Sequence, residues 1–312
     1  MKKILVTGAD GFVGRTMSEH LVASGHTVLR VVRVRGDDGA IAVGDIASYH
    51  EWPSLLASVD VVVHLAARAH VLREVGGDSL ERFRRVNVAA TLQLARAAAR
   101  AGVRRFIFLS SIGVNGVSTA DRAFCEADEP NPSEPYAISK WEAEQGLLAI
   151  GERMEITRVR SPLILGAGVK GNLQRLVKLV DSGFPLPLGA IRNRRSFIAL
   201  DDLCKLLALC VAHERAGGEL FLAADAEDLS TPDLLRSIAD GLGRPVHLVP
   251  VPLPALRLAA RAIGKEAELQ RMASSLRVRA DRVREILCWK STIGLRSAIK
   301  SMTECYLREH GH

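Results

Sequence analysis

Short, largely apolar segments alternate with stretches of helical periodicity through the first half of the chain, and this alternation constrains the fold most. The apolar segments are 4–7, 28–34, 40–45, 59–66, 104–111 and 154–160. The helical stretches are 13–24, 79–101 and 134–150. Apolar strands separated by helices are typical of a parallel sheet covered on both faces. The sequence therefore predicts an α/β fold with a Rossmann-like doubly wound parallel sheet.

The pattern changes after Pro162, where glycines and prolines become frequent up to about residue 195. The segment SFIAL (196–200) predicts a strand that returns to the sheet, followed by a helix over 201–213. We therefore expect a dinucleotide-binding domain built from 1–161 plus about 195–222. A smaller C-terminal substrate-binding α/β domain is expected from 162–194 plus 223–312.

The charge balance narrows the range of partners. The 312 residues carry a net charge of +7, from 42 Lys and Arg against 35 Asp and Glu, and only 4% are aromatic. The basic residues are scattered, whereas a nucleic-acid binder concentrates them beside aromatic side chains. This favours an arginine-rich surface and no nucleic-acid partner. Two or three well-placed arginines could also serve an anionic small molecule.

The cysteines and the apolar runs indicate a cytoplasmic protein without metal. The five cysteines form no CxxC motif and no cluster with histidine, which favours reduced structural thiols. The first ten residues lack the apolar run of a signal peptide, and no uncharged stretch of membrane-spanning length occurs. We therefore expect no membrane partner and no metal site.

Three glycines directly follow the first predicted strand. Gly8, Gly11 and Gly14 form a G-x-x-G-x-x-G turn at the start of a helix. Such a turn lets the backbone approach a pyrophosphate, while the helix N-terminus supplies N–H donors. A plain helix-entry turn is the alternative, but the position after an apolar strand favours dinucleotide binding.

The end of the second predicted strand bears on the choice of dinucleotide. An acidic residue there would hold the ribose hydroxyls of NAD. This chain has Val32, Arg33 and Arg35 instead. An arginine can pair with a 2′-phosphate, so NADP(H) is favoured and NAD(H) remains possible. Alternatively, Arg33 is simply a solvated residue at the strand end.

A tyrosine and a lysine lie four residues apart near the start of a predicted helix. Tyr136 and Lys140 therefore share one helix face. A nearby ammonium group is expected to lower the phenol pKa and make Tyr136 a general acid/base. Ser110 and Ser111 end the fifth predicted strand, where parallel sheets present catalytic groups. One of these hydroxyls could hydrogen-bond the substrate oxygen on which Tyr136 acts.

Together these motifs resemble the extended short-chain dehydrogenase/reductase family of NAD(P)-dependent nucleotide-sugar epimerases and dehydratases, over nearly all of the chain. The motifs are TGADGFVG (7–14), GDI (44–46), HLAA (64–67), NVAAT (87–91), LSSIGVNG (109–116), YAISK (136–140), GNL (171–173) and RRSFIALDDL (194–203). Several look most like bacterial surface-polysaccharide enzymes that act at C4 of UDP-linked sugars.

The resemblance implies roles for individual residues. Ser111 stands at the family's spacing before Tyr136, so Ser111, Tyr136 and Lys140 are the expected catalytic residues. Cofactor contacts are implied for Gly8, Gly11, Phe12, Val13, Gly14, Arg33, Asp45, Ile46, Leu65, Ala66, Ala67, Asn87, Lys140, Ser161 and Pro162. Substrate contacts are implied for Ser111, Asn172, Leu173 and Arg195.

The resemblance leaves three functions open. The first is reduction of a UDP-4-keto-hexosamine for surface polysaccharide synthesis, favoured by the missing carboxylate after the second strand. The second is a UDP-sugar 4-epimerase, of the UDP-GlcNAc or UDP-glucose type, with tightly bound NAD. The third is an NADP-sensing regulatory protein, which the intact Tyr136 and Lys140 disfavour. The helices over 79–101 and 134–150 resemble those that form a homodimer interface in this family.

The chain also departs from the family pattern, and some residues have ordinary structural explanations. Asn115 stands where epimerases often have tyrosine, and Leu165 and Ala167 replace a common Y-G-P pattern. His64 is expected to be a packed, hydrogen-bonded histidine, and Cys204 and Cys210 to lie in the core. The stretch 255–265 resembles a membrane-surface helix, but without an aromatic anchor we expect it to pack in the core.

Overall fold

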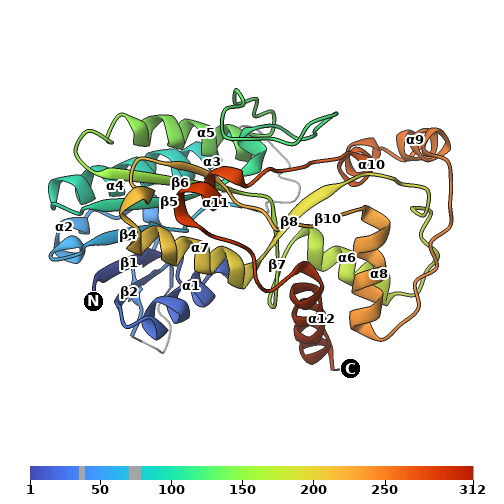
Figure 1. The fold of residues 1–312 in the computed structure, drawn as a ribbon, viewed down its shortest axis with the longest axis horizontal. Coiled ribbons are helices and arrows are strands. Elements are labelled where there is room, and N and C mark those ends of the chain that lie inside the picture. Colours follow the sequence, from blue (N-terminus) through green and yellow to red (C-terminus); the bar gives the residue numbers. More distant parts are fainter. Residues whose placement is uncertain (35–38, 70–78, 312) are drawn as a thin grey trace.

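A seven-stranded sheet, parallel throughout, forms the centre of the computed structural model, which describes residues 1–34, 39–69 and 79–311 (Figure 1). Its strand order is β3 (Ile41–Ala42), β2 (Thr27–Val32), β1 (Lys3–Thr7), β4 (Val61–His64), β5 (Arg105–Ser111), β6 (Glu155–Ser161) and β9 (Leu220–Leu222). Every neighbouring pair is parallel. The predicted Rossmann-like sheet is confirmed.

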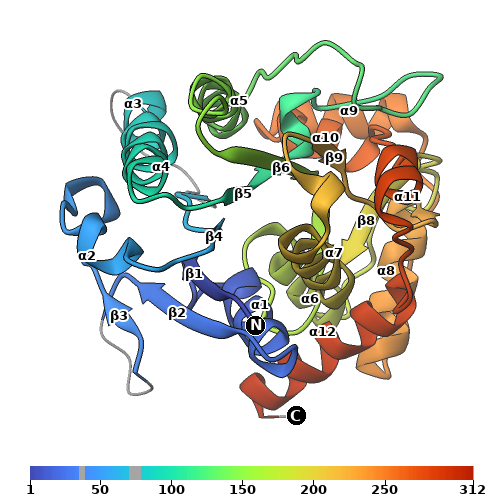
Figure 2. The ribbon, with the colours of Figure 1, turned by 60° about the vertical axis from the view of Figure 1, so that its left-hand side comes forward.

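Helices cover both faces of this sheet, and Figure 2 shows the two layers on opposite sides. One face carries α1 (Phe12–Ala23) and α7 (Leu200–Ala212), which share a core with α11 (Asp281–Leu287). The other carries α2 (Trp52–Leu56), α4 (Thr91–Arg100) and α5 (Pro135–Leu148). Burial on both faces explains why the central strands are almost wholly apolar.

The strand predicted at 196–200 belongs to a different sheet. β8 (Arg195–Ala199) lies between β7 (Leu163–Leu165) and β10 (Asp228–Leu229) in a separate three-stranded sheet. The seventh place in the main sheet is taken by β9. Ile198 of β8 packs into the main core, while Phe197 and Ala199 pack into the second core. A strand buried on both sides has an apolar sequence that does not say which sheet it joins.

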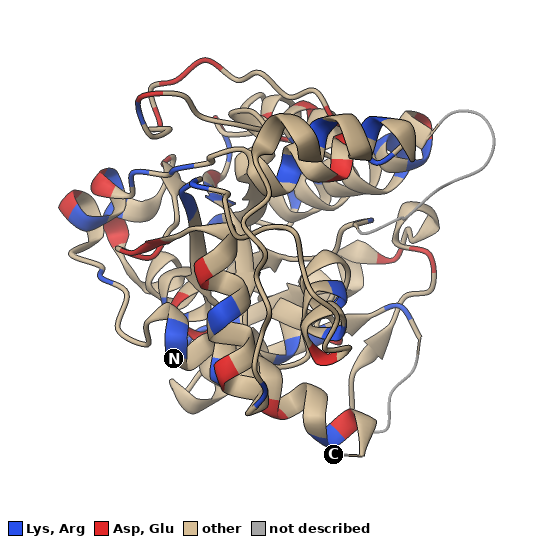
Figure 3. Ribbon diagram, turned by 90° about the vertical axis from the view of Figure 1, so that its right-hand side faces the viewer, with Lys and Arg blue, Asp and Glu red and all other residues tan. Residues whose placement is uncertain are grey.

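The second core is formed by α6 (Asn172–Asp181), α8 (Thr231–Leu242) and α12 (Leu295–His310), together with the small sheet. The chain returns to the main core at 276–289. The predicted domain boundaries remain a prediction. Charged residues of both signs are interspersed over the ribbon (Figure 3).

The expectation that 255–265 packs in the core is wrong. This stretch forms most of α9 (Leu253–Ala262), which pairs with α10 (Glu266–Ala273) at the edge of the molecule (Figure 1). Leu256 is buried, but Leu258 is 73% and Ile263 67% exposed. With a single buried residue, α9 has too narrow an apolar stripe to enter a core.

The helix predicted over 79–101 is three helical stretches in succession. They are α3 (Ser79–Phe83), the π-helical η2 (Arg84–Ala90) and α4. Three 3-10 turns complete the described structure: η1 (Ile46–Ser48), η3 (Ile112–Val114) and η4 (Glu214–Ala216). Within the described ranges, no helix has the length and apolar character needed to cross a bilayer. Those ranges also contain no group of three or more His, Cys, Asp or Glu suited to a metal ion.

Candidate active site

The glycine turn brings β1, α1 and the end of β4 into close contact. Gly8 has a φ of +65°, and a β-carbon there would lie 2.9 Å from the Ala66 backbone. A β-carbon at Gly14 would lie 2.0 Å from the Gly8 carbonyl oxygen. No side chain caps α1 at Gly11, so the first N–H groups of the helix have no side-chain acceptor. These residues fit a pyrophosphate.

A buried hydrogen-bonded chain joins β1 to β4, where the strand order reverses direction. Thr7 Oγ1 accepts the N–H groups of Leu65 and Ala66, at 3.2 Å each. Its own proton is thus directed to His64 Nδ1 at 2.7 Å, so we assign the single proton of the neutral ring to Nε2, which donates to Thr91 Oγ1 at 2.9 Å. Burial, and secondarily the Lys140 charge, lowers the pKa of His64 to about 3. The prediction of a packed, hydrogen-bonded histidine is confirmed.

The residues expected to hold the adenosine lie beside β2. Asp45 caps η1 by accepting the Ala47 N–H at 3.1 Å, and it also pairs with Arg85. Ile46 is half-buried. Arg33 is exposed, and the described residues give its guanidinium no hydrogen-bond or ion-pair partner. Arg35 lies outside the described residues.

The catalytic residues expected from the sequence gather at the carboxyl end of β5. Ser111 ends this strand and accepts the Gly113 N–H at 3.1 Å. A β-carbon at Gly113 would lie 3.2 Å from that of Ala137, so this turn packs directly on the first turn of α5. Tyr136 lies in that turn, and Lys140 follows one turn later with its Nζ 4.2 Å from the centre of the Phe108 ring.

Burial controls the ionisation of this pair in the chain by itself. It raises the pKa of Tyr136 to about 12 and lowers that of Lys140 to about 7. The expectation that Lys140 lowers the phenol pKa is therefore wrong for the unliganded chain. Desolvation disfavours both charged forms and is the largest influence on each pKa. The structure thus presents a neutral phenol near an amine that titrates close to neutrality.

Asn87 joins the exit of β4 to the start of α5. It lies in the π-helical stretch η2, and π-helical turns are frequent at functional sites. Its Oδ1 accepts the Arg68 N–H at 2.8 Å, and its Nδ2 donates to Ser139 Oγ at 2.9 Å. Ser139 in turn donates to the Tyr136 carbonyl oxygen at 2.7 Å. Asn87 therefore fixes the turn that carries Tyr136.

Apart from Ser111, the residues expected to contact substrate lie on the small-sheet side. Asn172 begins α6 and is exposed, whereas the Leu173 side chain is buried in the second core. Arg195 donates from Nη1 to the carbonyl oxygens of Arg271, at 2.5 Å, and Ser274, at 3.1 Å. These bonds leave the rest of its guanidinium for a ligand. Ser161 and Pro162 are buried at the end of β6.

A buried polar cluster beside the catalytic residues was not predicted. Glu144 of α5 and Arg160 of β6 form an ion pair at 2.6 Å with side chains 0% and 2% exposed. Ser110 donates to Glu144 at 2.5 Å, and Arg160 donates to Asn115 at 2.9 Å. An arginine inside an apolar strand was the available signal. Ser110 is engaged here, and Ser111 as the catalytic serine stays a prediction.

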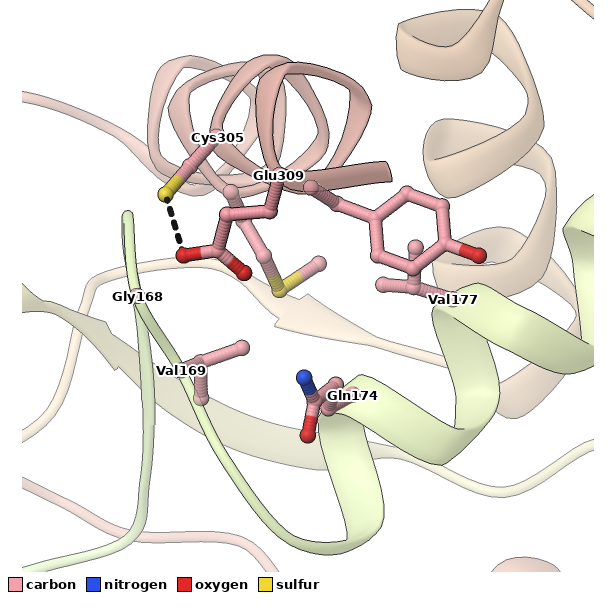
Figure 4. A pocket seen from close by; sticks show the side chains of 8 residues that line it. Gly168, Val169, Gln174, Val177, Cys305 and Glu309 are labelled. Carbon is pink, nitrogen blue, oxygen red and sulfur yellow. Dashed lines mark hydrogen bonds between the residues drawn. The ribbon is translucent and has the colours of Figure 1, made fainter. Parts of the chain in front are cut away.

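A small hollow lies apart from these residues, between α6 and α12. Gly168, Val169, Gln174, Val177, Met302, Cys305, Tyr306 and Glu309 line it. Figure 4 shows Cys305 directed at the Glu309 carboxylate, to which its Sγ donates at 3.6 Å. It shares no residue with the cluster at the carboxyl edge of the main sheet.

Comparison with known proteins decides the family. The model of the NAD dependent epimerase/dehydratase family matches residues 4–223. The chain belongs to this family. A UDP-glucose 4-epimerase of Vibrio cholerae is 37% identical over 315 residues, covering 98% of this chain and 96% of the relative. This confirms the prediction of an NAD(P)-dependent enzyme related to nucleotide-sugar epimerases.

A further relative and two solved structures are also epimerases. The N-acetyl-alpha-D-glucosaminyl-diphospho-ditrans,octacis-undecaprenol 4-epimerase of Escherichia coli O157:H7 is 28% identical over 261 residues, covering 80% of this chain and 76% of the relative. A UDP-glucuronic acid 4-epimerase from Bacillus cereus, solved in complex with NAD, superposes with a TM-score of 0.80 at 19% identity, covering 99% of each chain. A UDP-glucose 4-epimerase from Thermotoga maritima, solved with UDP-glucose, gives 0.79 at 20% identity, covering 99% of this chain and 100% of the other. At these identities the two structures support the fold.

Proposed function

We propose that the chain is a UDP-sugar 4-epimerase that retains its nicotinamide dinucleotide between half-reactions. The observation that carries the proposal is the placement of Ser111, Tyr136 and Lys140 together at the carboxyl end of β5. The near full-length similarity to the Vibrio cholerae UDP-glucose 4-epimerase supports this reaction over reduction of a 4-keto sugar.

The chain's own residues supply the proton chemistry. Tyr136 accepts the proton of the sugar C4 hydroxyl, and Ser111 donates a hydrogen bond to the same oxygen. The Lys140 ammonium stabilises the phenolate that this step requires. A bound nicotinamide would supply the hydride acceptor and donor for C4. After the 4-keto sugar has turned its other face, Tyr136 gives the proton back, and the inverted alcohol results.

The binding residues divide between the two cores. We propose that Gly8, Gly11 and Gly14, with the start of α1, hold the pyrophosphate, and that Asp45 and Ile46 lie at the adenine. Leu65, Ala66 and Ala67, together with Asn87, Ser161 and Pro162, would line the rest of the dinucleotide site. The nucleotide-sugar would contact Asn172, the Leu173 backbone and Arg195, in the smaller C-terminal domain.

The second candidate is an NADPH-dependent 4-ketoreductase of a UDP-4-keto-hexosamine. The observation that favours it is Arg33, which is exposed at the end of β2 and available to a 2′-phosphate. A reductase exchanges its cofactor at every turnover, whereas an epimerase keeps it. The two candidates therefore differ in what the purified protein carries.

The deciding experiment uses the protein as purified, without added cofactor. The epimerase proposal predicts NAD released on denaturation and interconversion of UDP-glucose with UDP-galactose, or of UDP-GlcNAc with UDP-GalNAc. Tyr136→Phe should lower turnover by about 10²–10⁴-fold and leave the NAD content unchanged. Tyr306→Phe, which loses a bond to Asp181 in the second core, is the matched control. Turnover that requires added NADPH and a 4-keto substrate would establish the reductase.

We also propose a cytoplasmic homodimer that pairs α4 and α5 with the same helices of a second copy. The paired helices would bury part of each protomer's surface and hold α5 in place from outside. Light scattering over a hundredfold concentration range tests this proposal. A constant monomer mass would contradict it.

A further inference from the structure

Two opposite charges, Lys140 and Glu144, lie one turn apart on α5, and both are almost completely buried. Glu144 is held on two sides. Arg160 donates to its carboxylate from Nε, at 3.0 and 3.2 Å, and from Nη2 at 2.6 Å. Ser110 donates to Oε1 at 2.5 Å. These donors stabilise the ionised carboxylate away from water.

Lys140 lacks such partners. Among the described residues, Nζ has no hydrogen bond or ion pair, and it lies over the face of the Phe108 ring. His64, on whose pKa the Lys140 charge acts, and Tyr136, one turn earlier on α5, are both neutral near pH 7, because burial puts the pKa of His64 at about 3 and that of Tyr136 at about 12. The Coulomb interaction that raises the pKa of Lys140 comes from Glu144. Glu144 is therefore the anion that acts on the ammonium.

We propose that Glu144, clamped by Arg160 and Ser110, is a positioning residue that keeps the buried Lys140 ammonium charged beside Tyr136. Its influence passes through a weakly screened interior, where Coulomb attraction is felt beyond contact distance. Asn115, which stands where epimerases often have tyrosine, accepts a hydrogen bond from Arg160 Nη1 through its Oδ1. It thereby helps to hold Arg160 against Glu144. The consequence for catalysis rests on the proposed function.

The sign of the effect follows from the charges. Burial lowers the pKa of Lys140 to about 7, and Glu144 acts in the opposite direction. Lysine loses its charge as pH rises through its pKa. Removing the Glu144 charge should lower this pKa further, so that Lys140 becomes neutral at a lower pH. The alkaline limb of the turnover profile should move to lower pH with it.

The direct test is an NMR titration of the protein labelled with ¹³Cε-lysine, which carries nine lysines. Lys140→Arg identifies the Lys140 resonance. Glu144→Gln should move the titration midpoint of Lys140 down by about one pH unit or more. Glu142→Gln is the matched control, because it removes a carboxylate from the same helix that pairs with Arg84 at the surface, and it should leave the midpoint unmoved.

Two further variants keep the test decisive. Glu144→Asp retains the charge and should restore most of the midpoint, which a purely structural role would not do. If Glu144→Gln fails to fold because Arg160 is left unpaired, the double variant with Arg160→Met removes both charges and should show the same downward shift. An unmoved midpoint in whichever of these neutral variants folds overturns the coupling.

The turnover profile separates the coupling from the reaction. A midpoint and an alkaline limb that move together support the positioning role. If the Lys140 midpoint moves and the alkaline limb of turnover does not, the positioning role is overturned, although Glu144 still controls the Lys140 charge. If no UDP-sugar is turned over at any pH, the proposed function fails, and the NMR midpoint still decides whether Glu144 controls the Lys140 charge.

Discussion

Two glutamates of α5 form ion pairs of the same length in opposite environments. Glu142 pairs with Arg84 at 2.6 Å, with side chains 31% and 40% exposed. Glu144 pairs with Arg160 at 2.6 Å, with side chains 0% and 2% exposed. Exposed pairs contribute little because water solvates each charge separately. A buried charge that loses its partner has no such alternative, so the environment and not the distance decides what each pair does.

The largest expected effect comes from breaking the buried pair. Arg160→Met should lower the free energy of unfolding by about 3–5 kcal/mol, since Glu144 would be left as an unpaired buried charge. Arg84→Met is the matched control on the surface and should change stability little. Urea denaturation of both variants measures the difference. Equal losses would show that burial does not separate the two pairs.

The buried Thr7–His64–Thr91 hydrogen-bonded chain should make the free energy of unfolding depend on pH in the acid range. The folded pKa of His64, about 3, lies below the unfolded value of 6.5, so folding favours the neutral ring. Its contribution is therefore complete above pH 6.5 and is lost as pH falls toward 3, at up to about 1.4 kcal/mol per pH unit.

Urea denaturation at pH 6.5 and pH 5 measures this loss, which should be about 2 kcal/mol for the His64 contribution. His64→Gln removes the titrating ring and should flatten the dependence. His247→Gln changes an exposed histidine and should leave the dependence as it is. A dependence that is equally steep in all three proteins would show that other groups cause it.

The main sheet and the small sheet differ in how far the sequence predicted them. Six of the seven main strands were expected because each is a short, largely apolar run that stands apart from the stretches of helical periodicity. β9 was missed because it has three residues, and β8 was assigned to the wrong sheet because both of its faces are buried. α9 was placed in the core because it lacks an aromatic anchor, although Leu256 is buried and Leu258 is exposed.

The site divides in the same way. The three glycines and the Tyr136–Lys140 pair can be recognised in the sequence, because the residues that act together lie only a few positions apart. The partners of Asn87 and Glu144 come from other elements and depend on tertiary packing. The pKa of Tyr136 was misjudged for the same reason. The sequence shows a nearby lysine but not the burial that opposes it.

The exposed end of β2 offers a test of the cofactor preference. If Arg33 pairs with a 2′-phosphate, the unmodified protein should bind NADP(H) at least as tightly as NAD(H). Arg33→Asp should shift the ratio of the two dissociation constants toward NAD(H) by about tenfold or more, the scale of a charge-assisted contact. Fluorescence titration with NADPH and NADH measures both constants. A ratio that does not change would show that Arg33 faces solvent.

The smallest expected effect concerns how helices end. α8 ends at Gly243 with a φ of +67°, whereas α11 ends at Cys288 with a φ of +51°. This left-handed conformation disfavours any residue with a β-carbon. Because Cys288 is exposed, its side chain contributes little packing against this strain. Cys288→Gly should therefore raise the free energy of unfolding by roughly 0.5–1 kcal/mol. This is a net value, because the greater flexibility of glycine in the unfolded chain offsets part of the relieved strain. Cys288→Ala keeps the β-carbon and should give no such gain, so equal stabilisation by both variants in thermal unfolding would trace the effect to the thiol instead of the backbone.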